Sequence, residues 1–315
     1  MGISFSSTAV GLTELQRPWF GNPVIQRVAQ APLPPGTLCP SPTAVNLTDA
    51  NQVIAQLRQL TDGLRDRSVA VSLPDQCVSV GLFNLESFPQ DEVERLGLLR
   101  WRFEHQEKSV SGDTVLRYRM FHSPQDDDKR VTQVLAVMIK QPVLREYEAA
   151  LHAAGLLPVS VGVATLQLFE LCRSLMTSSH EVVFAHHHDE TMTVIALRQG
   201  MPVFLRTIPL RRRQVDLRRE LLGTLQFYND QMTRTRVRKR EEVTTVYMVS
   251  DAPFTPAEST AHPEGAEDGE MWLPTGHLDW RVKVIPIGWG TLPVMKGALD
   301  HASTELSALA SGVAA

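Results

Sequence analysis

Three histidines followed by an aspartate, His186-His187-His188-Asp189, are the residues of this chain best suited to metal chemistry. If the segment is a strand, His186 and His188 share one face, and neutral imidazole is a common ligand for zinc or nickel. Two ligands do not close a structural site, and no cysteine stands nearby in the sequence. His180 would add a ligand only if the chain folds back. We therefore expect a solvated strand end without a bound metal.

A basic run is the second feature that could do chemistry, because it could bind an anion. Between residues 206 and 240 there are eleven lysines and arginines and only three acidic residues. Such a patch suits acidic lipid headgroups, an acidic partner or nucleic acid, but it also suits one solvated helix face and a charged turn. The only aromatics there, Phe227 and Tyr228, fit a core pattern, so we expect no nucleic acid. The arginines of the predicted patch are Arg211, Arg212, Arg213, Arg218 and Arg219.

The sequence contains no familiar motif for covalent or nucleotide-dependent catalysis. It lacks G-x-S-x-G, the phosphate-binding P-loop and His-Glu-x-x-His. Its three cysteines are far apart, which argues against a disulfide framework and favours a reduced, intracellular setting. Cys77 and Cys172 lie within apolar patterns, so we expect both in the core.

Composition indicates an ordinary globular protein. A length of 315 residues suits two modest domains, and the chain is 43% hydrophobic and 21% charged. The net charge of -4 argues against a general nucleic-acid binder. No run of residues is apolar and long enough for a membrane-spanning helix, so if the protein works at a membrane we expect something else to bring it there.

The elements that would position these residues alternate between strand-like and helix-like periods, which predicts an α/β fold. Expected strands lie at 3–10, 11–15, 24–29, 68–73, 77–85, 116–121, 131–140, 156–163, 181–197, 202–208, 243–249 and 281–287. Expected helices lie at 49–65, 90–104, 142–155, 164–176 and 214–230, with an alanine-rich helix at the C-terminus. Residues 251–269, rich in proline, glycine and acidic side chains, are predicted to form a loop.

Several short segments, none diagnostic alone, occur in an order and spacing that resembles one protein family. They lie at 2–15, 31–36, 69–74, 90–101, 146–159, 200–209 and 225–231. Together they are similar to the actin-like family of FtsA and, more closely, to the PilM-type proteins of type IV pilus assembly. The resemblance implies a two-lobed, ribonuclease-H-like fold with a small inserted α/β subdomain.

On that resemblance, residues 1–70 and 154–178 form the first lobe, 71–153 the inserted subdomain and 179–315 the second lobe. The family usually inserts a further subdomain between a hairpin like 200–209 and a helix like 225–231. In the family, that subdomain forms one wall of the nucleotide cleft. Here only about fifteen residues separate the two segments, so we expect the subdomain to be missing and the second lobe to be reduced.

The resemblance also locates a nucleotide site whose chemistry has been lost. In the first hairpin the acidic position falls on Ser4, the glycine on Ser6 and the lysine on Gly11, while Ser7 and Thr8 keep hydroxyls. In the second hairpin the acid becomes His186 and the glycine His188, followed by Thr191 and Thr193. The glycine pair near the adenosine becomes Ser250 and Asp251, and this carboxylate would repel a polyphosphate. We therefore expect a pseudo-ATPase without ATP or magnesium as cofactor.

The family resemblance implies a cytoplasmic scaffold, peripheral at the inner membrane, that binds the N-terminal tail of a PilN-like membrane protein beside the inserted subdomain. Other platform or motor proteins and self-association are further partners that it allows. The residues predicted to contact the tail are Val80, Leu82, Leu85, Leu96 and Trp101. Three alternatives stay open: an ATP-binding switch, the cytoplasmic part of a type II secretion platform protein, and a polyanion- or RNA-binding module that uses residues 211–240.

Overall fold

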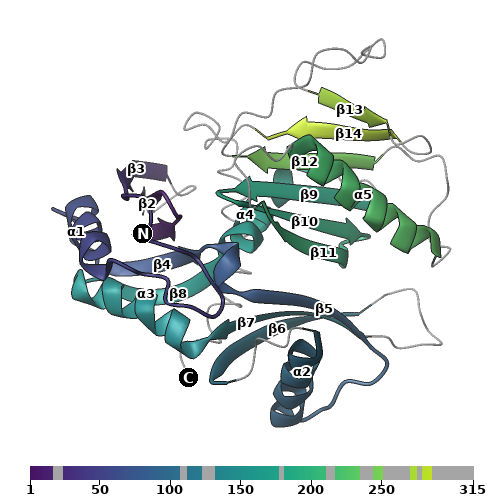
Figure 1. Ribbon diagram of the computed structural model, residues 1–315, viewed down its shortest axis with the longest axis horizontal. Helices are drawn as coiled ribbons and strands as arrows, with labels where there is room; N and C mark the ends of the chain where they lie inside the picture. Colours follow the sequence, from purple (N-terminus) through teal and green to yellow (C-terminus); the bar gives the residue numbers. More distant parts are fainter. Residues whose placement is uncertain are drawn as a thin grey trace. The chain divides into compact units, whose positions relative to one another are not determined.

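The computed structural model describes residues 1–16, 24–106, 112–122, 132–176, 181–210, 217–234, 244–250, 270–274 and 279–285. These residues form two compact units, one ending at Leu175 and the other beginning at Met176. The first unit contains two sheets and the second unit contains one (Figure 1). Each sheet has its own apolar core.

A five-stranded sheet forms the centre of the first unit, in the order β3-β2-β1-β4-β8. Its strands are β1 (Gly2–Phe5), β2 (Ala9–Gln16), β3 (Val24–Pro32), β4 (Ser68–Leu73) and β8 (Leu157–Val163). The first three strands are antiparallel neighbours, whereas β4 runs parallel to β1 and to β8. Helices α1 (Ala50–Leu60) and α3 (Gln141–Ala153) contribute to the core of this sheet.

Helix α1 begins where the sequence predicts and ends earlier. Asp49 is its N-cap, with its carboxylate accepting the Gln52 N–H at 3.0 Å. Val53, Leu57 and Leu60 are buried at helical spacing. The helix stops at Leu60 rather than at residue 65, because Thr61 turns back to bond the Leu57 carbonyl and Gly63 adopts a positive φ of 75°.

The inserted part of the first unit is a three-stranded antiparallel sheet in the order β5-β7-β6. Its strands are β5 (Ser79–Leu85), β6 (Thr114–His122) and β7 (Thr132–Lys140), and a short 3₁₀ turn at Asp75–Cys77 leads into it. Helix α2 (Glu92–Gln106) covers one face (Figure 1). Phe83 of β5 and Phe103 of α2 meet edge to face there, with 5.2 Å between their ring centroids.

The unit ends in helix α4 (Ala164–Cys172) and a 3₁₀ turn at Arg173–Leu175. Asp75 ties this helix to the start of the inserted sheet, because its carboxylate accepts bonds from the Thr165 N–H and from the Thr165 hydroxyl. Cys77 and Cys172 are both buried, as their apolar patterns predict.

The second unit is a six-stranded sheet in the order β11-β10-β9-β12-β14-β13, packed against α5 (Leu217–Arg234). Its strands are β9 (Glu181–His188), β10 (Thr191–Arg198), β11 (Met201–Pro209), β12 (Thr244–Ser250), β13 (Glu270–Pro274) and β14 (Asp279–Val284). The single strand predicted at 181–197 is wrong: a tight turn divides it into β9 and β10, with Asp189 in the left-handed region at φ 53°. The loop predicted at 251–269 and the C-terminal helix lie outside the described residues.

Candidate functional site

The first hairpin carries the residues predicted to stand at the phosphate site. Ser4 of β1 lies opposite Gly11 of β2, and the Ser4 side chain is exposed. A Cβ added to Gly11 would stand 2.5 Å from the Ser4 Oγ. A lysine at this position would therefore require the Ser4 hydroxyl to turn away. Neither residue supplies the charge that positions a metal or a phosphate.

The turn of this hairpin uses part of its own hydrogen-bonding capacity. The buried Ser6 hydroxyl donates to the Ala9 carbonyl and accepts the Ala9 N–H, both at 3.0 Å. The Ser6 N–H also donates to the Ala9 carbonyl, and the Ser6 and Thr8 hydroxyls are 3.4 Å apart. Because phosphate loops bind through free N–H and hydroxyl groups, these bonds occupy three such groups: the Ser6 hydroxyl, the Ser6 N–H and the Ala9 N–H. Ser7 is partly exposed, and Thr8 is exposed.

In the second unit, the predicted site residues of β9 and β10 lie on one face of the sheet. Thr191 pairs with His188 and Thr193 pairs with His186. The two imidazoles are stacked, with 5.7 Å between ring centroids and 7° between their planes. His186 is 8% exposed, and a bare glycine backbone is absent at both histidine positions. An imidazole at each position covers main chain that a glycine would leave bare.

Ser250 lies on the opposite face of this sheet. It pairs with His187 in the register between β12 and β9, and its hydroxyl is 2.9 Å from the His187 Nδ1. The sheet therefore separates Ser250 from His186 and His188, which the sequence analysis assigned to the same site. Asp251, its predicted companion, lies outside the described residues.

Within the described residues, no three histidine, cysteine or acidic side chains are grouped closely enough to hold a metal ion. His188 Nε2 lies 3.9 Å from a carboxylate oxygen of Asp189, a distance typical of a weak ion pair when the imidazole is protonated. His180, the third ligand considered from sequence, lies outside the described residues.

The five residues predicted to contact a partner tail do not come together. Leu85 is 3% exposed in the core between the three-stranded sheet and α2, and Leu96 packs against that core. The alternation of β5 directs Val80 and Leu82 to the other face. Trp101 is 47% exposed on the outer surface of α2. Leu85 is therefore a structural residue, and α2 cannot share one binding surface with Val80 and Leu82.

The face of the three-stranded sheet opposite α2 combines apolar and basic side chains; we call it the open face. In register across the sheet, Val80 meets Val137 and Arg117, and Leu82 meets Leu135 and Arg119. The four apolar residues are partly exposed. Next to them, Val78, Val115 and Ile139 join the core of the five-stranded sheet. The open face is thus an apolar surface that continues from that core and is flanked by two arginines.

Only part of the predicted basic patch is described. Arg218 and Arg219 lie in the first turn of α5, where Arg218 is partly buried and Arg219 is exposed. Arg211, Arg212 and Arg213 lie outside the described residues.

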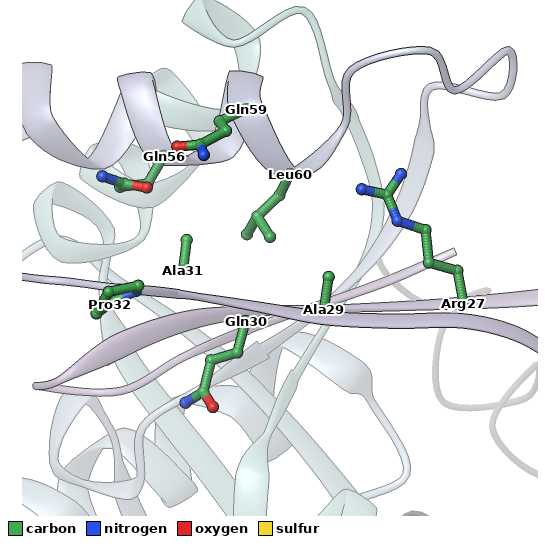
Figure 2. A pocket seen from close by; sticks show the side chains of 8 residues that line it. All are labelled: Arg27, Ala29, Gln30, Ala31, Pro32, Gln56, Gln59 and Leu60. Atoms are coloured by element: carbon green, nitrogen blue, oxygen red, sulfur yellow. The ribbon is translucent and has the colours of Figure 1, made fainter.

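The sequence analysis missed a pocket of about 420 Å³ between β3 and α1 (Figure 2). Ala29 and Ala31 of β3 form one wall, and Gln56, Gln59 and Leu60 of α1 form the other. Arg27, Gln30 and Pro32 complete the lining. The one local signal was a pair of glutamines at i and i+3 beside the buried stripe of α1, a pattern that an ordinary solvated helix flank also shows.

Comparison with known proteins supports the fold. No model of a protein family matches the sequence, and no curated protein matches it. A chain of the PilM-PilN type IV pilus biogenesis complex matches with a TM-score of 0.59 and 19% identity, over 79% of this chain and 80% of that chain. The protein therefore has the α/β fold predicted from its alternating strands and helices, and the actin-like fold that the family resemblance implies.

Two weaker structural matches cover most of the chain. The cytoplasmic domain of EpsL, an inner-membrane component of the type II secretion system of Vibrio cholerae, has 11% identity over 96% of this chain and 94% of that one. A Bacteroides thetaiotaomicron protein with an actin-like ATPase fold has 10% identity over 80% and 82%. Because both TM-scores are 0.47, we draw nothing further from them. None of the described helices is long and apolar enough to cross a membrane.

Proposed function

We propose that this protein is a cytoplasmic scaffold of a type IV pilus or pilus-like assembly platform, held at the inner membrane by a partner. The observation that carries the proposal is the match, over four-fifths of both chains, to a chain of the PilM-PilN complex. The segments that suggested a PilM-type protein from sequence support the same function. The matched protein's partner makes a PilN-like membrane protein the first candidate partner here.

The proposed scaffold does not use ATP. The first hairpin offers Ser4 and Gly11 where charge is required, and its turn bonds Ser6 to Ala9. The second hairpin carries two stacked imidazoles where a bare backbone is required. These losses affect separate parts of the site, so restoring one of them would not recover phosphate binding.

Titration calorimetry and thermal unfolding with Mg-ATP test this part of the proposal, with ADP and GTP as controls. We expect no heat of binding and no rise in melting temperature at millimolar nucleotide. A ligand present at 100 times its Kd would stabilise the folded protein by about 2.7 kcal/mol, which thermal unfolding detects easily. Micromolar binding would instead support the ATP-dependent switch.

We place the tail of the PilN-like partner on the open face. Val80, Leu82, Leu135 and Val137 offer partly exposed apolar side chains, and β5 is an edge strand of its sheet within the described residues. An extended tail could therefore pair its main chain with β5 and place alternate apolar side chains against this surface. Arg117 and Arg119 lie on β6 at the far edge of this face, so they would attract a carboxylate only from a part of the tail that crosses the open face.

A synthetic peptide of the N-terminal tail of the cell's PilN-like protein tests this site. Leu82→Glu buries a charge beneath the bound tail, and we expect it to weaken binding by at least about tenfold. Val93→Glu is the matched control, because Val93 is 77% exposed on α2, away from the open face. Equal binding by both variants and the unaltered protein would exclude the open face as the tail site.

A further inference from the structure

The pocket between β3 and α1 contains polar side chains that the folded chain does not use. Within the described residues, the side chains of Arg27, Gln56 and Gln59 make no hydrogen bond or ion pair. All three line the same pocket as the small side chains of Ala29 and Ala31 (Figure 2). A guanidinium and two amides beside an apolar floor suit a ligand with a carboxylate on an otherwise uncharged chain.

The main chain of β3 offers a second kind of recognition at the same place. In the described part of the sheet, β3 has β2 on one side and no strand on the other. Leu33 lies opposite Thr8 and donates its N–H to the Thr8 carbonyl at 2.7 Å. In an antiparallel ladder every second residue forms hydrogen bonds with the neighbouring strand. Counting by two from Leu33, the main-chain groups of Ala31 and Ala29 also bond to β2. The N–H and carbonyl groups of Gln30 and Val28 therefore point toward the open edge.

The pocket and the open edge are arranged so that one ligand can use both. A strand added beside β3 would lie about 4.8 Å away, and its alternate side chains would project on the α1 side of the sheet. Arg27, Ala29 and Ala31 share that side, whereas Gln30 points away from α1 (Figure 2). A side chain of the added strand would enter the pocket beside the two alanines and within reach of Arg27.

The charges around the pocket favour an acidic side chain. Glu14 of β2 lies opposite Arg27 in the register, on the side away from the open edge. Within the described residues no ion pair joins the two, so the Arg27 guanidinium is not neutralised by a direct contact with the Glu14 carboxylate. The exposed residues of β3 itself, Val24, Gln26, Gln30 and Pro32, carry no charge. A single carboxylate on the ligand would therefore meet one cation without a competing acidic group on β3.

We propose that the open edge of β3 binds an extended segment of a protein partner, with an acidic side chain of that segment held by Arg27 in the pocket. Main-chain bonds to Val28 and Gln30 supply affinity that does not depend on sequence, and the pocket supplies the preference for an acidic residue. This site is separate from the open face, so the scaffold can hold two partners at once.

A pair of defined peptides tests the site with the full-length protein. One is a capped octapeptide of alternating threonine and valine with a central glutamate, and the other has glutamine in its place. Binding is measured by fluorescence anisotropy of dye-labelled peptides, and hydrogen exchange locates it. We expect the glutamate peptide to bind about tenfold more tightly, and the Val28 and Gln30 amides to become protected.

Two pairs of variants separate the pocket from the strand edge. Arg27→Gln should abolish the preference for glutamate, whereas Arg65→Gln, the same change of charge outside the pocket, should keep it. Val28→Pro removes an N–H that faces the open edge and should weaken the binding of both peptides about tenfold. Val28→Ala keeps this N–H and should change their affinity by less than about twofold. Equal affinity for the two peptides, no binding of either, or full binding by Val28→Pro would overturn the proposal.

Discussion

The inserted sheet should depend on one aromatic contact, and replacing Phe103 by alanine is the sharpest test of its structure. Phe103 is 1% exposed and packs edge to face on Phe83, with 5.2 Å between the ring centroids and 89° between the ring planes. Removal of a buried phenylalanine side chain costs about 3–5 kcal/mol, from lost transfer energy and the cavity left behind. We expect the core formed by α2 and the three strands to lose that amount of stability.

Trp101 provides a control on the same helix. It is 47% exposed, and its ring contacts are His105, at 4.1 Å between centroids, and the Arg102 guanidinium, at 5.5 Å. Contacts at an exposed position of this kind contribute about 0.5–1 kcal/mol. Trp101→Ala should therefore destabilise the sheet far less than Phe103→Ala, although it removes the larger side chain.

Native-state hydrogen exchange is the suitable assay, because the chain has three separate cores and need not unfold in one transition. In Phe103→Ala, exchange of the β7 amides should accelerate by about a hundredfold or more, while amides of β9 and β10 in the second unit stay unchanged. Binding of the partner tail should also weaken, because Val80 and Leu82 belong to the same sheet. Equal acceleration by Trp101→Ala would refute this account of the core.

Three further predictions concern polar groups and thiols of the first unit. The Glu146 carboxylate accepts hydrogen bonds from the main-chain N–H groups of Asn46 and Leu47 at 2.7 and 3.1 Å. Glu146→Gln should therefore lower the free energy of unfolding, measured in urea, by about 1–3 kcal/mol. The control Glu148→Gln changes a side chain with no such bond and should lower it by less than about 0.5 kcal/mol. Burial raises the pKa of the Cys77 thiol from 9.0 to about 12, so unfolding releases its proton and stability should fall as pH rises from about 9 toward 12. Iodoacetamide at pH 8 should correspondingly modify the exposed Cys39 in the folded protein and reach Cys77 only after denaturation; rapid labelling of native Cys77 would contradict its burial.

Local sequence signals predicted the elements well where they were strong. Asp49 with the apolar spacing of Val53 and Leu57 located the start of α1, and the structure confirms it. The strand pattern missed the division between β9 and β10, which only the family resemblance placed in a hairpin, because Asp189-Glu190 lacks the glycine that usually marks a tight hairpin turn. The five predicted tail-contact residues do not share one surface, because alternation separates Leu82 from Leu85 without saying which face of the sheet α2 covers.

The sequence by itself determined the α/β class of the fold and which side chains stand at the positions that the family resemblance assigns to a nucleotide site. Both are local properties: periodicity marks strands and helices, and no packing can give Ser4 a carboxylate or His188 a bare backbone. Tertiary structure decided what shares a surface. Only the register places Ser250 with His187 rather than with His186, and only the packing of α1 over Ala29 and Ala31 creates a pocket beside Arg27. These relations join residues far apart in the chain, and they arise from burying apolar faces together, which no short segment encodes alone.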